Sequence, residues 1–131
     1  MTRSALSGLV LLALGIATTA CSPARQVAPP SSASGSGTTI ELTLKEYSIT
    51  PKAISAHAGQ RLTIVALNAG TMSHALTITG NGVTLSTKDL TFDPGTSETI
   101  TATVAAGTYT YFCPVDGHRQ LGMEGTLTVT P

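Results

Sequence analysis

The chain has 131 residues, of which seven are lysine or arginine and seven are aspartate or glutamate, so its formal net charge is zero. Only 11% of the residues are charged, whereas 41% are hydrophobic and 4% are aromatic. This composition argues against nucleic-acid binding, which requires a clustered basic surface, and the length predicts a single small domain.

Residues 1–20 have the pattern of a secretory signal peptide. Arg3 precedes an uncharged apolar run that ends in small residues and is shorter than the roughly 20 residues of a membrane-spanning helix. Cys21 follows directly, and Thr18-Thr19-Ala20-Cys21 resembles the cleavage box of bacterial lipoproteins, in which the cysteine is lipidated and becomes the first mature residue. The alternative is an ordinary signal peptide cut nearby, which would leave Cys21 as a free thiol.

The next segment is rich in Pro, Ser, Gly, Ala and Thr and carries one charge, Arg25. Such a composition is typical of a flexible tether, and a coil of this length would span about 25 Å. We therefore expect a lipidated Cys21 and tether over residues 21–39 and a folded domain over residues 40–131. That domain has five basic and seven acidic residues, a net charge of −2, which is too weak to indicate a partner by its sign.

Within the domain, apolar residues alternate with a period of two. The alternation is clear in segments 40–45, 62–66, 76–79 and 100–104, and it is typical of half-buried antiparallel strands. Turn sequences separate these segments at short intervals, and no stretch has a sustained helical period. The sequence therefore predicts an all-β fold, a Greek-key β-sandwich of about seven or eight strands.

Three residues with metal-binding side chains lie in the last strand–loop–strand segment, with four residues between Cys113 and His118 and four between His118 and Met123. Taken singly, each has an ordinary explanation as a packed or solvated side chain. Together, a thiolate, an imidazole and a thioether in one loop predict a soft metal site. Copper is the metal that these donors select, because zinc sites rarely use Met and magnesium or calcium require oxygen.

A trigonal copper site needs a second imidazole, and His74 is the candidate. It precedes the apolar strand at 76–79, which a sandwich can bring beside the Cys113 loop. His57 has no soft neighbour and is predicted to be exposed. Met72 is a rival thioether, but Met123 is preferred because it shares a loop with two other ligands.

The segment Ile40–Pro131 resembles the cupredoxins, the blue copper proteins that include plastocyanin, azurin, pseudoazurin and auracyanin. The matching sequences are ELTLKEYSITP, AGQRLTIVALNAGTMSHALTI and PGTSETITATVAAGTYTYFCPVDGHRQLGMEGTLTV. The spacing between cysteine and histidine is similar to that of auracyanin-like and azurin-like loops. The resemblance implies one Cu(I)/Cu(II) ion, with His74, Cys113 and His118 as strong equatorial ligands and Met123 as a long axial ligand.

Two positions depart from the family pattern. In much of the family a polar residue, often Asn, follows the upstream histidine and links the two ligand loops, whereas Ala75 follows His74 here. That link must come from elsewhere or be absent. Pro114 follows Cys113 and has no N–H to donate to the thiolate, which affects the reduction potential in a direction that we leave open.

The resemblance implies a one-electron carrier, not an enzyme. From the lipoprotein-like box at Cys21 we expect it to be lipid-anchored and extracytoplasmic at the cell membrane, on its periplasmic or outer face. It would act as a monomer with redox partner proteins. In the family the edge of the downstream histidine reaches the surface inside an apolar docking patch. Here we expect Pro114, Val115 and Leu121 to form that patch around His118, with Met72 opposite.

Other functions are compatible with a secreted β-domain. A copper-trafficking or copper-resistance protein is the main alternative, although few exposed Met or His residues are expected. An immunoglobulin-type sandwich is disfavoured because the domain has one cysteine and no Trp. Multicopper enzymes need further His ligands, and a binuclear centre needs a second loop cysteine, where Gly117 and Arg119 stand instead.

Overall fold

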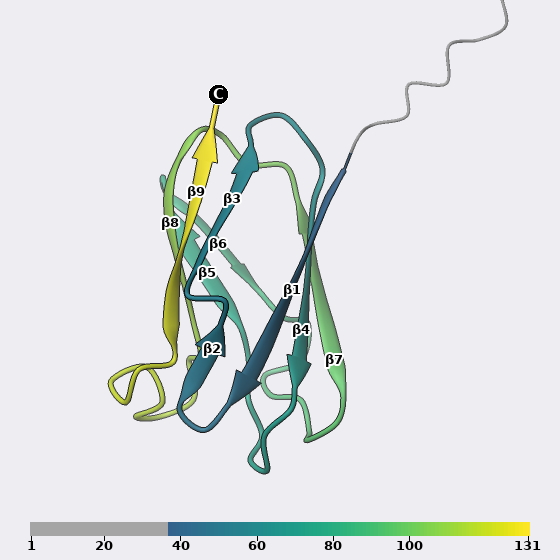
Figure 1. Cartoon of the computed structure of the whole chain (residues 1–131), viewed down its shortest axis with the longest axis vertical. Coiled ribbons are helices and arrows are strands. Elements are labelled where there is room, and N and C mark those ends of the chain that lie inside the picture. The colour runs from purple at the N-terminus through teal and green to yellow at the C-terminus, as the bar shows by residue number, and fades with distance from the viewer. Residues whose placement is uncertain (1–36) are drawn as a thin grey trace, which may run out of the picture. The chain divides into compact units, whose positions relative to one another are not determined.

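The computed structural model describes residues 37–131, which form two facing β-sheets (Figure 1). The strands are β1 (Thr38–Lys45), β2 (Ser48–Thr50), β3 (Ala53–His57), β4 (Leu62–Asn68), β5 (Thr77–Gly80), β6 (Val83–Ser86), β7 (Ser97–Ala102), β8 (Gly107–Phe112) and β9 (Glu124–Thr130). In this part of the chain no helix has the length and hydropathy needed to cross a membrane. The prediction of an all-β sandwich is confirmed.

Two details of the strand prediction need correction. The described residues contain nine strands rather than seven or eight, because the three residues of β2 are too few to show an alternating pattern. The first strand begins at Thr38, inside the segment expected to be a tether, because Thr38 and Thr39 pair with Leu62 and Thr63 of β4.

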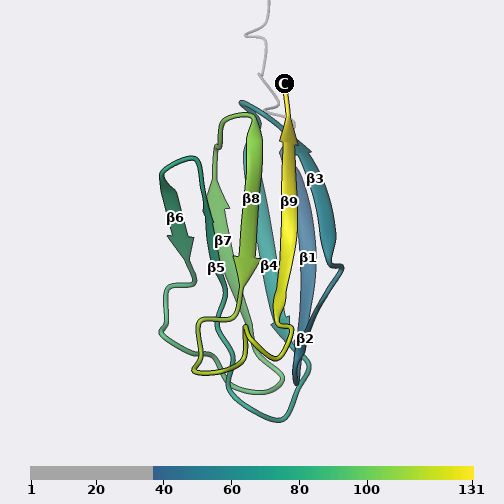
Figure 2. The ribbon, with the colours of Figure 1, turned by 90° about the vertical axis from the view of Figure 1, so that its left-hand side faces the viewer.

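The two sheets contain parallel as well as antiparallel pairs. One sheet has the order β2-β1-β4-β7 and the other the order β3-β9-β8-β5-β6, the latter facing the viewer in Figure 2. β1 pairs with β4 in parallel, and β3 pairs with β9 in parallel, so the expectation of antiparallel strands was wrong for these pairs. A period of two reports that one face of a strand is buried, but it does not report the direction of the neighbouring strand.

The hydrophobic core lies between the sheets. In β4, for example, Leu62, Ile64 and Ala66 are buried, whereas the residues between them are half-buried. The largest fully buried side chains are Tyr109 and Tyr111 of β8. Their hydroxyl groups donate to the carbonyl oxygens of Ala105 at 3.0 Å and of Pro51 at 2.5 Å, so these rings fill the core without leaving their polar atoms unpaired.

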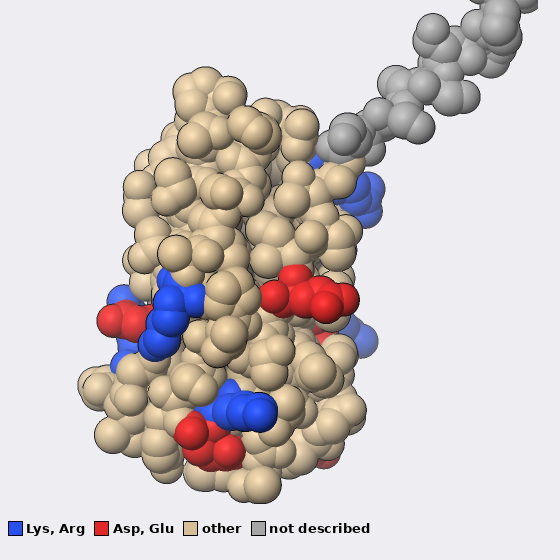
Figure 3. Space-filling view, viewed as in Figure 1, with Lys and Arg blue, Asp and Glu red and all other residues tan. Residues whose placement is uncertain are grey.

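Three connections meet at one end of the sandwich, the lower end in Figure 1: the β1–β2 turn, the β4–β5 connection and the β8–β9 loop. Strand β1 starts at the opposite end, since Thr38 pairs with the first residue of β4 and Leu44 pairs with the last, Asn68. Figure 3 shows the surface from the same side as Figure 1. Few charged groups of either sign lie on that surface, and its upper part is almost free of charge.

Candidate metal centre

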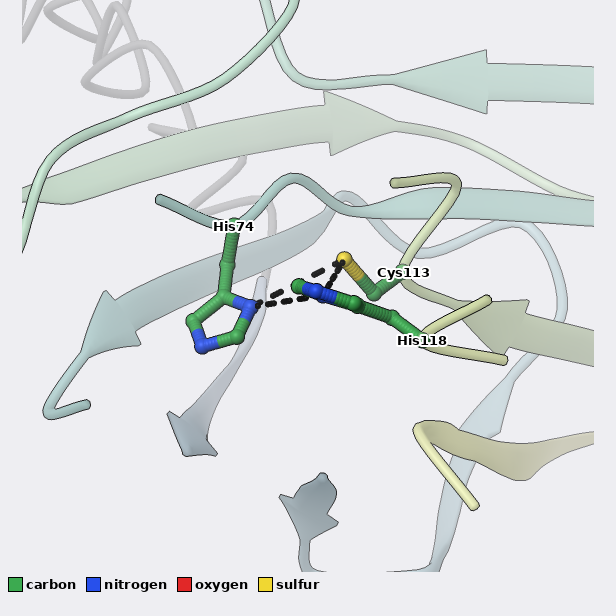
Figure 4. Close-up of side chains that lie close together, drawn as sticks. All are labelled: His74, Cys113 and His118. Carbon is green, nitrogen blue, oxygen red and sulfur yellow. Dashed lines mark hydrogen bonds between the residues drawn. The ribbon is translucent and has the colours of Figure 1, made fainter. Parts of the chain in front are cut away.

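His74, Cys113 and His118 bring their donor atoms within 4.8 Å of one another (Figure 4). The Nδ1 atoms of the two histidines are 3.2 Å apart, and the Cys113 Sγ lies 3.5 Å from His118 Nδ1 and 3.9 Å from His74 Nδ1. His74 and Cys113 are fully buried, and His118 is 4% exposed. Three donors predicted from sequence as ligands therefore converge in one shielded cluster.

The β8–β9 loop supplies two of these donors. Cys113 directly follows β8, and its N–H donates to the carbonyl of Met123 at 3.0 Å. The N–H of Met123 in turn donates to the carbonyl of His118 at 3.1 Å. The N–H of His118 donates to the carbonyl of Val115 at 3.0 Å. Gly117, with φ of 78°, permits the tight turn that this closure requires. The loop is thus held by its own backbone with Cys113 and His118 on the same side.

His74 comes from the β4–β5 connection and is fixed by a two-bond bridge to Phe92. The N–H of His74 donates to the carbonyl of Phe92 at 3.2 Å, and the N–H of Phe92 donates back at 2.8 Å. This isolated bridge pairs the backbone of His74 with that of Phe92 in the antiparallel manner of a sheet. It places the ring over the end of β8, where Cys113 lies.

The donor set fits a soft transition metal. Two imidazole nitrogens and one thiolate sulfur suit copper or zinc, whereas magnesium and calcium require oxygen ligands. The cluster contains no carboxylate among its members. Its burial excludes water from the three donors, which favours a closed site of protein ligands.

The predicted axial ligand, its rival and the remaining histidine lie in different surroundings. Met123 is fully buried and is bonded through its main chain to both Cys113 and His118. Met72 is 44% exposed, and its Sδ lies 4.0 Å from the hydroxyl of Tyr47. His57 is exposed, as predicted, and its Nδ1 contacts the Thr130 hydroxyl at 3.0 Å.

The residues expected to form a docking patch differ in exposure. Leu121 is 59% exposed and Pro114 is also exposed, whereas Val115 is half-buried and packs against the core. His118 is less accessible than the resemblance implies, being 4% exposed, and the ring of Tyr47 lies against it in a T-shaped arrangement with ring centroids 5.2 Å apart. Tyr47 itself is 40% exposed, so an aromatic ring that the sequence did not single out packs against His118 and reaches the surface.

Asn68 ties the β4–β5 connection, which carries His74, to the backbone of Phe92, although none of its hydrogen bonds reaches the β8–β9 loop. Its side-chain N–H₂ group donates to the carbonyls of Met72 at 2.8 Å and Phe92 at 3.0 Å, and its Oδ1 accepts from the N–H of Gly70 at 3.0 Å. Asn68 is fully buried. The sequence offered only a turn signal, Asn68-Ala69-Gly70, and no sign of these contacts.

Glu46, in the β1–β2 turn, is the other neighbour of His74 that sequence reasoning missed. Its Oε1 lies 3.5 Å from His74 Nε2 and accepts from the N–H groups of Thr71 at 2.6 Å and Met72 at 2.7 Å. Hydrogen bonds from its own amide and from these two amides lower the pKa of Glu46 to about 2. Burial lowers the pKa of His74, and the nearby His118 lowers it further, while Glu46 opposes both effects.

Comparison with known proteins agrees with this geometry. The chain matches the family model described as "Cupredoxin-like domain" over residues 10–129. A dithionite-reduced auracyanin from the photosynthetic bacterium Roseiflexus castenholzii has a TM-score of 0.65 and 28% sequence identity, with 74% of this chain and 100% of that chain covered. No curated protein sequence matches the chain significantly.

Two further auracyanins have the same fold at lower identity. Auracyanin B has a TM-score of 0.61 and 22% identity, covering 71% of this chain and 88% of its own. Auracyanin A, described as a "blue" copper protein from the green thermophilic photosynthetic bacterium Chloroflexus aurantiacus, has a TM-score of 0.62 and 22% identity, covering 72% and 99%.

Proposed function

Because the chain belongs to the cupredoxin-like family, we propose that it is a blue copper protein that carries single electrons. The observation that carries this proposal is the buried cluster of His74, Cys113 and His118. Its two nitrogens and one sulfur are the strong donors of a blue copper site. The likeness to an auracyanin at 28% identity supports the same conclusion.

We assign His74 Nδ1, Cys113 Sγ and His118 Nδ1 as the equatorial ligands of one copper ion, and Met123 as the axial ligand. The burial of Met123 and its main-chain bonds to Cys113 and His118 support the axial role. Bound copper would supply a one-electron couple. The chain holds the ligands in place through the Phe92 bridge and the closed β8–β9 loop, so little rearrangement would accompany a change of oxidation state.

The partner is a redox protein that docks over the loops at the ligand end. Leu121 and Pro114 are exposed there, and Val115 lies beside them. Exposed Met72 and Tyr47 extend the apolar surface on the other side of His118. The low charge of the domain favours docking through such apolar contacts rather than through long-range attraction.

We further propose that the protein is a monomeric lipoprotein outside the cytoplasm, anchored to the cell membrane through Cys21. The signal peptide over residues 1–20 and Cys21 lie outside the described residues. The position of β1 supports the proposal, because Thr38 lies at the end of the sandwich opposite the metal centre. A tether entering there would leave the ligand end free to meet a partner.

The test is to load the domain lacking residues 1–37 with Cu(II). We expect a deep blue colour from thiolate-to-copper charge transfer, and we expect Cys113→Ser to abolish it. A colourless protein that binds zinc equally well would refute the proposal. Reversible one-electron voltammetry is expected of a carrier, whereas rapid copper transfer to an acceptor with poor voltammetry would identify a trafficking protein.

A further inference from the structure

The outer ring nitrogen of His74 has no hydrogen-bond partner among the described residues. Figure 4 shows the ring with Nδ1 turned toward Cys113 and His118 and with Nε2 turned away from them. Nε2 is fully buried and makes no hydrogen bond. A buried nitrogen of this kind requires a partner, because leaving it unpaired is unfavourable.

The chemistry of the proposed site determines which kind of partner is needed. A neutral imidazole carries one N–H group, and a metal bound at Nδ1 leaves the proton on Nε2. Nε2 of His74 is then a donor that needs an acceptor. Ligating histidines in metal sites usually find this acceptor in a carboxylate, a carbonyl or water.

Glu46 presents such an acceptor. Its Oε1 lies 3.5 Å from His74 Nε2, a few tenths of an ångström beyond an ordinary N–H···O hydrogen bond. A carboxylate has about four acceptor positions on its two oxygens, so the three amides that bind Glu46, those of Thr71, Met72 and Glu46 itself, leave a position for one further donor. A small rotation of the carboxylate or the ring would complete the bond.

The carboxylate is built into the loop that carries His74. Its hydrogen bonds to Thr71 and Met72 hold it in place, and its side chain is only 24% exposed. Gly70 makes space for it, because a Cβ at that position would lie 2.5 Å from Glu46 Oε1. These contacts place the carboxylate beside the outer nitrogen of His74.

We propose that Glu46 is a positioning residue of the metal centre, whose carboxylate accepts the Nε2–H of His74 and so fixes the tautomer and orientation of that ligand. The inference rests on the proposed copper function. Its consequence is electrostatic as well as geometric. A carboxylate on the outer nitrogen makes the imidazole a stronger donor, which stabilises the higher charge of Cu(II) and lowers the reduction potential.

The experiment compares Glu46→Gln, Glu46→Ala and the control Glu41→Gln in the full chain. Glu46→Gln keeps an acceptor oxygen and removes the charge, whereas Glu46→Ala removes both. Glu41 is exposed on β1, the strand that precedes the turn carrying Glu46, so its variant makes the same change of charge away from the site. The measurements are the reduction potential, the copper affinity, and NMR detection of the His74 Nε2–H in the Cu(I) form, with circular dichroism of each metal-free variant to confirm folding.

We expect both Glu46 variants to raise the potential, and Glu46→Ala to weaken copper binding by about 10- to 100-fold. The Nε2–H signal should be protected from exchange in the wild type and in Glu46→Gln, but not in Glu46→Ala, and Glu41→Gln should match the wild type. If the wild type binds copper and turns blue while the Glu46 variants keep its potential and its protected signal, the inference is wrong and the proposed function stands. A wild type that binds no copper overturns both.

Discussion

Replacing Asn68 by Ala should destabilise the domain more than any surface change, because this one side chain joins three backbone groups. It donates to the carbonyls of Met72 and Phe92 and accepts from the N–H of Gly70. A hydrogen bond of this kind contributes about 1 kcal/mol net. The Phe92 carbonyl still accepts from His74 in the variant, and water can reach the partly buried groups, so we expect a loss of about 2–3 kcal/mol.

That loss is a large part of the roughly 5–15 kcal/mol that stabilises a typical domain. The assay is urea unfolding of the metal-free protein under reducing conditions, followed by circular dichroism because the chain has no Trp. The dependence of the unfolding free energy on urea should be unchanged, since the exposed surface is nearly the same. In the thermal melt the midpoint should fall by roughly 10–20 °C.

Two controls sharpen the interpretation. Asn68→Asp keeps the acceptor for Gly70 but places a negative oxygen against the carbonyls of Met72 and Phe92, so at neutral pH it should be at least as harmful as Ala. Thr99→Ala, on the exposed face of β7, should change stability by less than about 0.5 kcal/mol. If Asn68→Ala lost less than about 0.5 kcal/mol, or if Asn68→Asp matched the wild type, the β4–β5 connection would not depend on this side chain and our account of its stability would be wrong.

Three further predictions follow from the packing and the assigned ligands. Gly125→Ala should destabilise the fold by about 1–3 kcal/mol, because a Cβ there would overlap the Tyr111 ring; urea unfolding measures this, and an unchanged midpoint would show that the ring can shift. Met123→Leu should alter the visible spectrum of the copper form while Met72→Leu leaves it unchanged, and the reverse pattern would exchange the two assignments. Leu121→Lys should slow electron exchange with the partner without changing the spectrum, and equal rates would remove Leu121 from the docking surface.

The parts of the site that could be predicted from sequence are those in which chemistry and spacing coincide. Cys113 and His118 share one loop, so their spacing already limits how far apart they can lie. His74 required the further step of assuming a sandwich. The period of two correctly predicted a sandwich of two sheets, because the alternation within each single strand already shows that one of its faces is buried.

The surroundings of the ligands could not be predicted, because they depend on which strands are neighbours. Glu46 reaches His74 only because β1 lies beside β4 in parallel register, with Leu44 opposite Asn68. Nothing in the alternation of residues 40–45 distinguishes this arrangement from an antiparallel one. The role of Asn68 could not be predicted either. In the sequence a buried asparagine cannot be distinguished from one in an exposed turn, and its contact with the Phe92 carbonyl becomes evident only from the structure.

One turn supports both histidine ligands, which gives the β1–β2 connection a role beyond joining two strands. Glu46 faces the outer nitrogen of His74, and the next residue, Tyr47, packs edge-on against His118. The two contacts act on different properties: the carboxylate acts on the charge and orientation of a buried ligand, whereas the partly exposed aromatic ring forms part of the surface beside the other. Because neither residue belongs to the proposed ligand set, changes in this turn can adjust the potential of the centre and the surface beside it while leaving its donors intact.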